Sequence, residues 1–193
     1  MTLDLNKAKS GGTFTRAEDG SYPARFVQVI DLGVQPQEDY QTGEAKEPKP
    51  RVLLTFEFPT ERIEVNGEDR PRWYSKEYTI SNHEKAGILK VVKSLDPSGK
   101  EMQLSKLLGK PCLITIGSTS TGKPKIVSIA PPMKGMEVGE LENPPVAFDF
   151  DNPDVGLFNS LPDWLKEKIR GALNFEGSPL KDMLENFNDD IPF

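Results

Sequence analysis

The sequence predicts a mainly β protein. We expect a five-stranded, partly open barrel with one helix between the third and fourth strands, which is the element order of an OB-fold. Short runs with alternating apolar residues recur between residues 20 and 130 and predict the strands. One run with helical spacing leaves three strands before it and two after it. Other small barrels also have five or six strands, so this order favours an OB-fold without singling it out.

Three strands are expected before the helix, at Gly20–Leu32, Arg51–Phe58 and Arg72–Ile80. Asn66-Gly67 predicts a hairpin turn ahead of the third strand. Residues 35–50 contain three prolines, and we expect a long polar loop without regular structure there. The first strand has apolar residues on both faces, as in a strand bent around a barrel. Strict alternation groups four of its residues on one face: Ala24, Phe26, Gln28 and Ile30.

The helix is expected over Asn82–Leu95, with Ser81 or Asn82 as its cap. A further helical turn is expected at residues 104–108, before the strands Pro111–Gly117 and Lys125–Ala130.

The loop between these last two strands reads Gly117-Ser118-Thr119-Ser120-Thr121-Gly122-Lys123, a phosphate-loop pattern. The next residue is Pro124 instead of Ser or Thr, and a strand follows where a nucleotide-binding loop needs a helix. We therefore expect a β-hairpin tip.

The chain divides into four predicted parts. Residues 1–19 form a flexible arm, 20–134 the OB-fold domain, 135–176 an acidic linker, and 177–193 a disordered acidic tail that binds other proteins. Within the linker, Leu161–Gly171 predicts a short helix with Pro near its start and Gly at its end. Its apolar stripe is expected to pack on the barrel; a partner contact or dimer contact is the alternative. The stripe comprises Trp164, Leu165, Ile169, Ala172 and Leu173.

Composition narrows the class of protein. Only 36% of the 193 residues are hydrophobic and 17 are prolines, so we expect a core smaller than the chain. Residues 1–134 hold 20 basic against 17 acidic side chains, a net charge of +3, whereas residues 135–193 hold 4 against 13, a net of −9. A mildly basic body can bind a polyanion despite the acidic total. One cysteine and the lack of a long apolar run predict a soluble cytoplasmic protein.

The third strand carries the residues best suited to binding. Its alternation puts Arg72, Tyr74, Lys76 and Tyr78 on one face, and the other face holds Trp73 and its neighbours. Cations that meet phosphates and rings that stack on bases are what single-stranded nucleic acid requires. The alternative is an edge strand whose tyrosines pack on neighbouring strands. A bulge near Pro71 would bring Trp73 to the binding side instead. Further candidates for nucleic-acid contacts are Tyr40, Arg51, Arg62, Lys123 and Lys125.

The chain ends Asn188-Asp189-Asp190-Ile191-Pro192-Phe193, and its last twelve residues hold four carboxylates and no Lys or Arg. Such a tip suits another protein's pocket, where the ring is buried and basic residues meet the acids; a frayed acidic terminus is the alternative. The order of residues resembles the acidic tip that ends bacterial single-stranded DNA-binding proteins (SSBs) and some phage counterparts. In that family the tip recruits replication and repair proteins.

The resemblance implies a protein without catalytic activity that coats single-stranded DNA without sequence specificity during phage or bacterial replication, recombination and repair. Partners would bind Asp189, Asp190, Ile191, Pro192 and Phe193. Such a protein works in the cytoplasm, which is the host's if a phage encodes it. Bacterial SSBs are usually tetramers, so self-association stays open. The alternatives are an adaptor that competes for the partners of a host SSB, and a strand-annealing or recombination-mediator protein.

No cofactor or metal is expected. His83 is the only histidine, which argues against a metal site or a catalytic triad. Cys112 lies in an apolar strand and is expected to be a core thiol.

Overall fold

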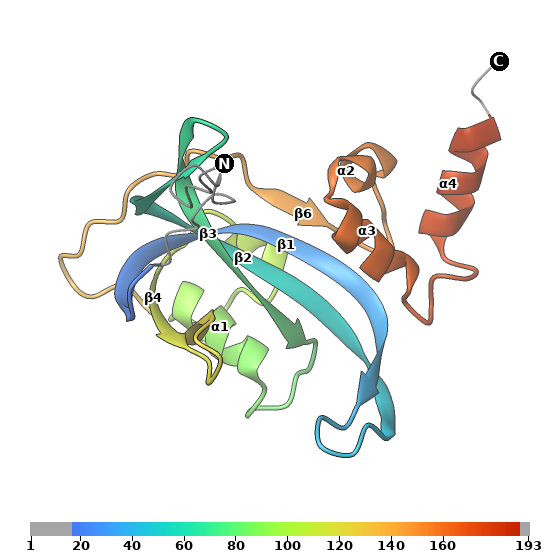
Figure 1. Cartoon of the computed structure of the whole chain (residues 1–193), viewed down its shortest axis with the longest axis horizontal. Helices are drawn as coiled ribbons and strands as arrows, with labels where there is room; N and C mark the ends of the chain where they lie inside the picture. Colours follow the sequence, from blue (N-terminus) through green and yellow to red (C-terminus); the bar gives the residue numbers. More distant parts are fainter. Residues whose placement is uncertain (1–16, 190–193) are drawn as a thin grey trace, which may run out of the picture.

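One curved sheet dominates the computed structural model, which describes residues 17–189 (Figure 1). Five antiparallel strands lie in the order β3-β2-β1-β4-β5, and the short strand β6 pairs in parallel with β1. This order ends at β3 and at β5, so the sheet is open within the described residues. The strands are β1 (Gly20–Glu38), β2 (Ala45–Val65), β3 (Glu68–Thr79), β4 (Pro111–Ser118), β5 (Pro124–Ala130) and β6 (Val146–Phe148).

Helices pack against both faces of the sheet. Helix α1 and a 3₁₀ turn, η2, lie between β3 and β4 in the chain, and three helices follow β6. Among the described helices, none combines the length and the apolar character needed to cross a bilayer. The helical segments are α1 (Gly87–Leu95), η2 (Leu104–Leu107), α2 (Val155–Ser160), α3 (Asp163–Arg170) and α4 (Pro179–Asp189).

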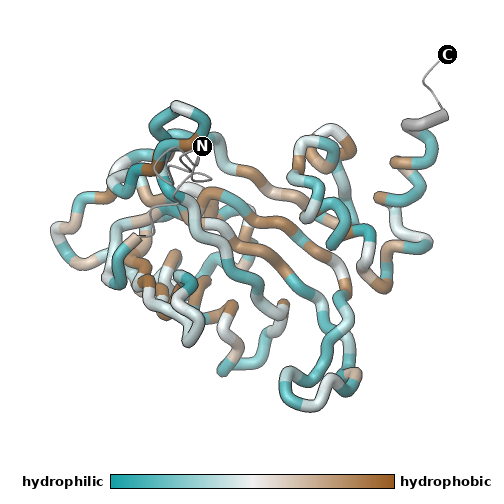
Figure 2. Tube along the Cα trace, in the orientation of Figure 1, coloured by the Kyte–Doolittle hydropathy of each residue, from teal (hydrophilic) through white to brown (hydrophobic). Residues whose placement is uncertain are grey.

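The main hydrophobic cluster lies between the sheet and α1. The alternate residues of β2 point into it, and α1 contributes residues spaced three to four apart, as an amphipathic helix should. Figure 2 shows the same pattern along the chain, with apolar colour in the middle of β1 and β2 and polar colour in their distal hairpin. The residues that β2 and α1 contribute to this cluster are Val52, Leu54, Phe56, Phe58, Ile88, Val91, Val92 and Leu95.

A second hydrophobic cluster lies on the opposite face of the sheet, under α2, α3 and α4. Phe26 belongs to the first cluster, but Ile30 and Leu32 of the same strand belong to the second. A register shift between Phe26 and Gln28 explains the change, because one inserted residue turns the following side chains to the other face. Ile169 of α3 is fully buried against this second cluster.

The expected loop at residues 35–50 is instead the end of a long β-ribbon. Strand β1 continues to Glu38 and β2 starts at Ala45, so the turn between them is short. Its geometry is set by the Asp39 carboxylate, which accepts hydrogen bonds from two backbone N–H groups of the turn. Pro36 and Pro48 fall in an irregular part of the ladder, where a missing N–H donor costs no pairing.

Several predicted elements agree with the structure. Asn66 and Gly67 both have positive φ, at 54° and 82°, as a two-residue hairpin turn requires. The phosphate-loop pattern is the turn of the β4–β5 hairpin, where the Thr119 N–H donates to the Lys123 carbonyl. Cys112 is fully buried in the first cluster.

Other boundaries differ from the predictions. Helix α1 starts at Gly87 after an extended Ala86, so neither Ser81 nor Asn82 caps it. The predicted linker contains two elements that were not expected, β6 and α2. Val146–Phe148 forms the strand β6 by pairing with β1.

The tail predicted to be disordered forms helix α4 up to Asp189. Ser178 accepts a hydrogen bond from the Lys181 N–H at the start of this helix, and Leu180 is fully buried in the second cluster. The ammonium of Lys181 also pairs with Glu176 and Glu185. Local capping and one buried leucine therefore order a segment whose composition is largely polar. The residues of the predicted arm up to 16 and those of the tip from 190 lie outside the described residues.

Candidate nucleic-acid interface

The two tyrosines of β3 point into the protein. Tyr78 is 9% exposed, and its burial raises its pKa to about 12. Tyr74 is partly buried and meets Phe58 edge-on, with ring centroids 5.2 Å apart. The face predicted to stack on bases is therefore the core face of β3, and these rings are not presented to a ligand.

Arg72 and Lys76 lie on the same face of β3 as the tyrosines, Arg72 half-buried and Lys76 exposed. The Arg72 Nε atom is buried and has no hydrogen-bond partner within the described residues. The Lys76 ammonium lies 5.4 Å from the Tyr78 ring centroid and donates a 3.3 Å hydrogen bond to the Ile126 carbonyl of β5. Lys76 thus bridges the two end strands of the open sheet.

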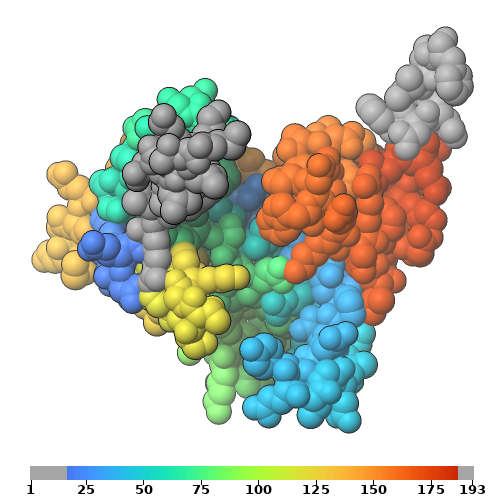
Figure 3. Space-filling model, in the orientation of Figure 1, coloured from blue at the N-terminus to red at the C-terminus, as the bar shows by residue number. Residues whose placement is uncertain are grey.

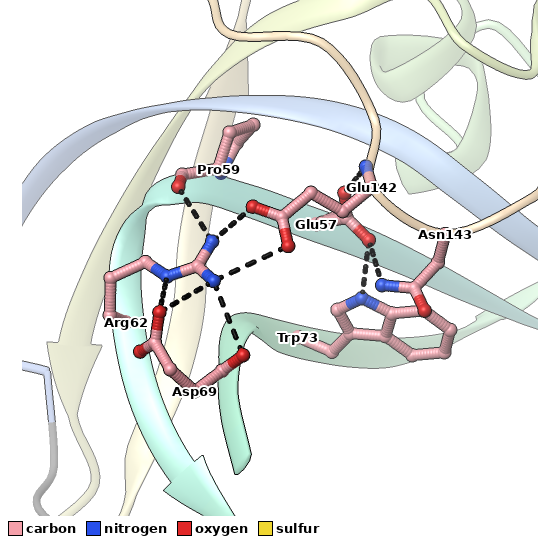
Figure 4. A network of polar contacts seen from close by, with 7 residues as sticks. All are labelled: Glu57, Pro59, Arg62, Asp69, Trp73, Glu142 and Asn143. Atoms are coloured by element: carbon pink, nitrogen blue, oxygen red, sulfur yellow. Dashed lines mark hydrogen bonds and ion pairs between the residues drawn. The ribbon is translucent and has the colours of Figure 1, made fainter.

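The outer face of β3 carries Trp73, and this residue is 40% exposed. Glu57 on the neighbouring strand β2 is fully buried and accepts a 2.8 Å hydrogen bond from the Trp73 indole N–H. The same carboxylate accepts 2.7 Å hydrogen bonds from the Glu142 backbone N–H and the Asn143 side-chain amide (Figure 4). One buried carboxylate therefore fixes the edge of the exposed indole and ties the 142–143 segment to the sheet.

A groove with a volume of about 350 Å³ runs between this face and the helices α2 and α3. Trp73 and Ser75 come from β3, and Trp164, which is 55% exposed, comes from α3. Gln28 and Leu53 reach it from the adjacent strands. Figure 3 shows the surface hollowed between the green strand β3 and the orange helices. Both tryptophans of the chain thus line one groove.

Charged side chains lie beyond Ser75 on the same side of β3. Glu77 is two residues further along, and it pairs with Arg51 of β2, at 3.4 Å, and with Lys168 of α3. Arg51 also donates a 2.9 Å hydrogen bond to the Thr79 hydroxyl. Two cations meet one carboxylate here, which leaves one positive charge in excess.

The other predicted contact residues lie apart from the groove. Arg62 pairs with Glu142 and Asp69, and these hydrogen bonds raise its pKa further. Tyr40 is fully exposed at the turn of the β1–β2 ribbon, and Lys123 and Lys125 are exposed on the β4–β5 hairpin.

Sequence reasoning assigned Trp164 to the buried stripe of its helix and gave no role to Gln28, Glu57 or Lys168. In α3, Leu165 and Ile169 are buried whereas Trp164 is not. The spacing of Trp164 four residues before Lys168 was the available signal, because such positions share one face of a helix.

Within residues 17–189, no group of three His, Cys, Asp or Glu side chains is placed to hold a metal ion. Burial raises the pKa of the Cys112 thiol to about 12, so it is not a nucleophile at neutral pH.

Comparison of the chain with protein-family models, with curated proteins and with solved structures finds no match. The geometry of the groove and its surroundings is therefore the basis for assigning a function.

Proposed function

We propose that this chain is a non-catalytic protein that binds single-stranded DNA along the outer face of β3, beside the helices that cover the outer rows of β1 and β2. The observation that carries the proposal is the exposed indole of Trp73 on β3, beside the exposed small polar side chain of Ser75. Unstacked bases need exposed aromatic faces, and a duplex offers none of its bases for stacking.

The strand order supports an OB-fold as the underlying architecture. In such a barrel the third strand must approach the fifth, and Lys76 joins β3 to the Ile126 carbonyl of β5. The face formed by the second and third strands is the one that binds oligonucleotides in OB-folds, and it is the face on which Trp73 lies.

Charge supports the same assignment. The net charge of +3 on residues 1–134 and the excess cation among Arg51, Lys168 and Glu77 favour a polyanion. Released counterions would make binding weaken as salt rises.

The acidic end of the chain gives the protein a second role, the recruitment of replication and recombination proteins. Helix α4 carries the chain out to Asp189, and the SSB-like order of residues continues from there to Phe193. In a cell, the protein would coat single strands in the cytoplasm and bring such partners to them.

Binding of a labelled poly-dT strand, followed by fluorescence anisotropy at two salt concentrations, tests the proposal. A duplex of equal length is the control. We expect tight, salt-weakened binding to the strand and much weaker binding to the duplex. Absence of strand binding at low salt would refute the proposal and leave the adaptor role, with the tip as its functional part. Annealing of complementary strands would instead indicate the mediator role.

Deletion of residues 190–193 should abolish capture of partner proteins while leaving affinity for poly-dT equal or tighter, because an anionic competitor is removed. Anisotropy and pull-down of replication proteins measure the two effects. Clearly weaker DNA binding by the truncated chain would contradict the separation of the two roles.

A further inference from the structure

We propose that the groove between β3 and α3 holds one unstacked nucleobase between the indoles of Trp73 and Trp164, a proposal that rests on the proposed function. The C-terminal helices would then supply half of the binding site rather than a mere cover for the sheet. Trp73 belongs to the sheet and Trp164 to α3, and both line the same groove. Stacking of bases on aromatic side chains is the main contact by which proteins bind single strands of any sequence.

Position along the two walls gives the groove a direction. On β3, Trp73, Ser75 and Glu77 follow at intervals of two and share the outer face. On α3, Trp164 and Lys168 are four residues apart and share one helix face. Since Lys168 reaches across to Glu77, the two tryptophans lie at one end and the charged group at the other. A base at the aromatic end puts its neighbouring phosphate toward the excess cation.

The floor of the groove can hydrogen-bond to a base edge. The Thr55 hydroxyl donates to the Gln28 side-chain oxygen at 3.0 Å and lies 2.8 Å from the Ser75 hydroxyl. These two hydrogen bonds hold the side-chain amide of Gln28 in place. The nitrogen of this amide has no acceptor among the described residues. Base carbonyls supply the acceptor that such an N–H₂ group requires.

The size of the groove suits a small planar ligand. Its volume of about 350 Å³ lies at the lower end of the range of about 300–1,000 Å³ found for small-molecule sites. Trp73 is held edge-on by the buried Glu57, so one stacking surface is fixed before a ligand arrives. Binding to a ring that is already fixed costs less free energy, because the side chain need not be ordered when the ligand arrives.

The test uses the two tryptophans of the chain as separate reporters. In a Trp73→Phe variant, Trp164 is the only source of indole fluorescence. We expect poly-dT to quench this emission, and an equally long strand of abasic sites to bind more weakly without quenching it. In the otherwise unaltered chain, Trp164→Ala should weaken poly-dT binding by about 5- to 100-fold with an unchanged salt dependence. Leu173→Ala is the matched control, because Leu173 is equally exposed but outside the groove.

The outcomes separate this inference from the proposed function. Poly-dT binding with unchanged Trp164 emission and an unaffected Trp164→Ala variant would overturn the nucleobase site while leaving single-strand binding intact. No binding of poly-dT by the unaltered chain would overturn both. Quenching by a peptide with the sequence of residues 188–193, but not by poly-dT, would assign the groove to an acidic peptide and also overturn the inference. Circular dichroism of each variant checks that the fold is retained.

Discussion

Glu57→Gln tests whether one buried carboxylate organises the exposed indole of Trp73 and the 142–143 segment. The substitution keeps the shape of the side chain and removes its charge. Three N–H donors now converge on the carboxylate, from Trp73, Glu142 and Asn143. Glutamine offers one oxygen and an N–H₂ group, so at least one of these donors would face another donor.

The expected loss of stability follows from that mismatch. A hydrogen bond to a charged group contributes about 1.5–3 kcal/mol, and a buried donor left without a partner costs about 1–3 kcal/mol. Glu57 is fully buried, so water cannot take over its hydrogen bonds. Glu57→Gln should therefore lower the free energy of unfolding by about 2–4 kcal/mol.

Urea unfolding followed by circular dichroism measures this loss. With a slope of about 2 kcal/mol per molar urea, the midpoint should fall by about 1–2 M and the slope should stay unchanged. Glu140→Gln is the control, because the Glu140 side chain is 90% exposed and only pairs with Arg25. Equal midpoints for Glu57→Gln and the unaltered chain would refute the claim that the carboxylate holds this network together.

Cys112 has its pKa raised from about 9 to about 12, so its contribution to stability is complete below pH 9 and is lost as the pH rises toward 12. Urea titrations between about pH 8 and 10.5 should show a smaller loss of stability for Cys112→Ala than for the unaltered chain, and equal losses would contradict the buried thiol. Tyr78→Ala should cost about 3–5 kcal/mol of unfolding free energy, because the ring is in the core; an unchanged stability would place it at the surface. Ile169→Ala should cost about 2–5 kcal/mol, whereas Leu173→Ala should change stability by less than about 0.5 kcal/mol; similar values for both would argue against docking of α3 on the sheet.

Local patterns were enough to predict most elements of the β domain. Alternation identified the strands, and Asn66-Gly67 identified a hairpin turn, because both signals depend on neighbouring residues only. The order of three strands, a helix and two strands was likewise predictable. The strand β6 was not, because three residues of an acidic, proline-containing segment carry no period, and only pairing with β1 makes them a strand.

The residues of the groove were only partly predictable. Trp73 was a candidate, but Trp164 lies on another element more than 80 residues away, and no local pattern states that α3 returns to β3. Gln28 was grouped with Phe26 by alternation, and the bulge between them separates the two. Glu57 was given no role, because its three donors reach it from β3 and the 142–143 segment, which are remote from it in the sequence.

One local feature sets which face of β3 is turned to the core. Near the hairpin turn, Val65 faces Glu68, and an unbroken ladder from there would put Tyr74 opposite Pro59, on the outer row of β2. The ladder instead skips residues 59–61 between the pairs Arg62↔Pro71 and Phe58↔Arg72. An odd number of inserted residues reverses the facing of everything beyond it. The tyrosines therefore face the core, and Trp73 faces Glu57 and the groove. A bulge beside Pro71 thus decides which ring of this strand can reach a ligand.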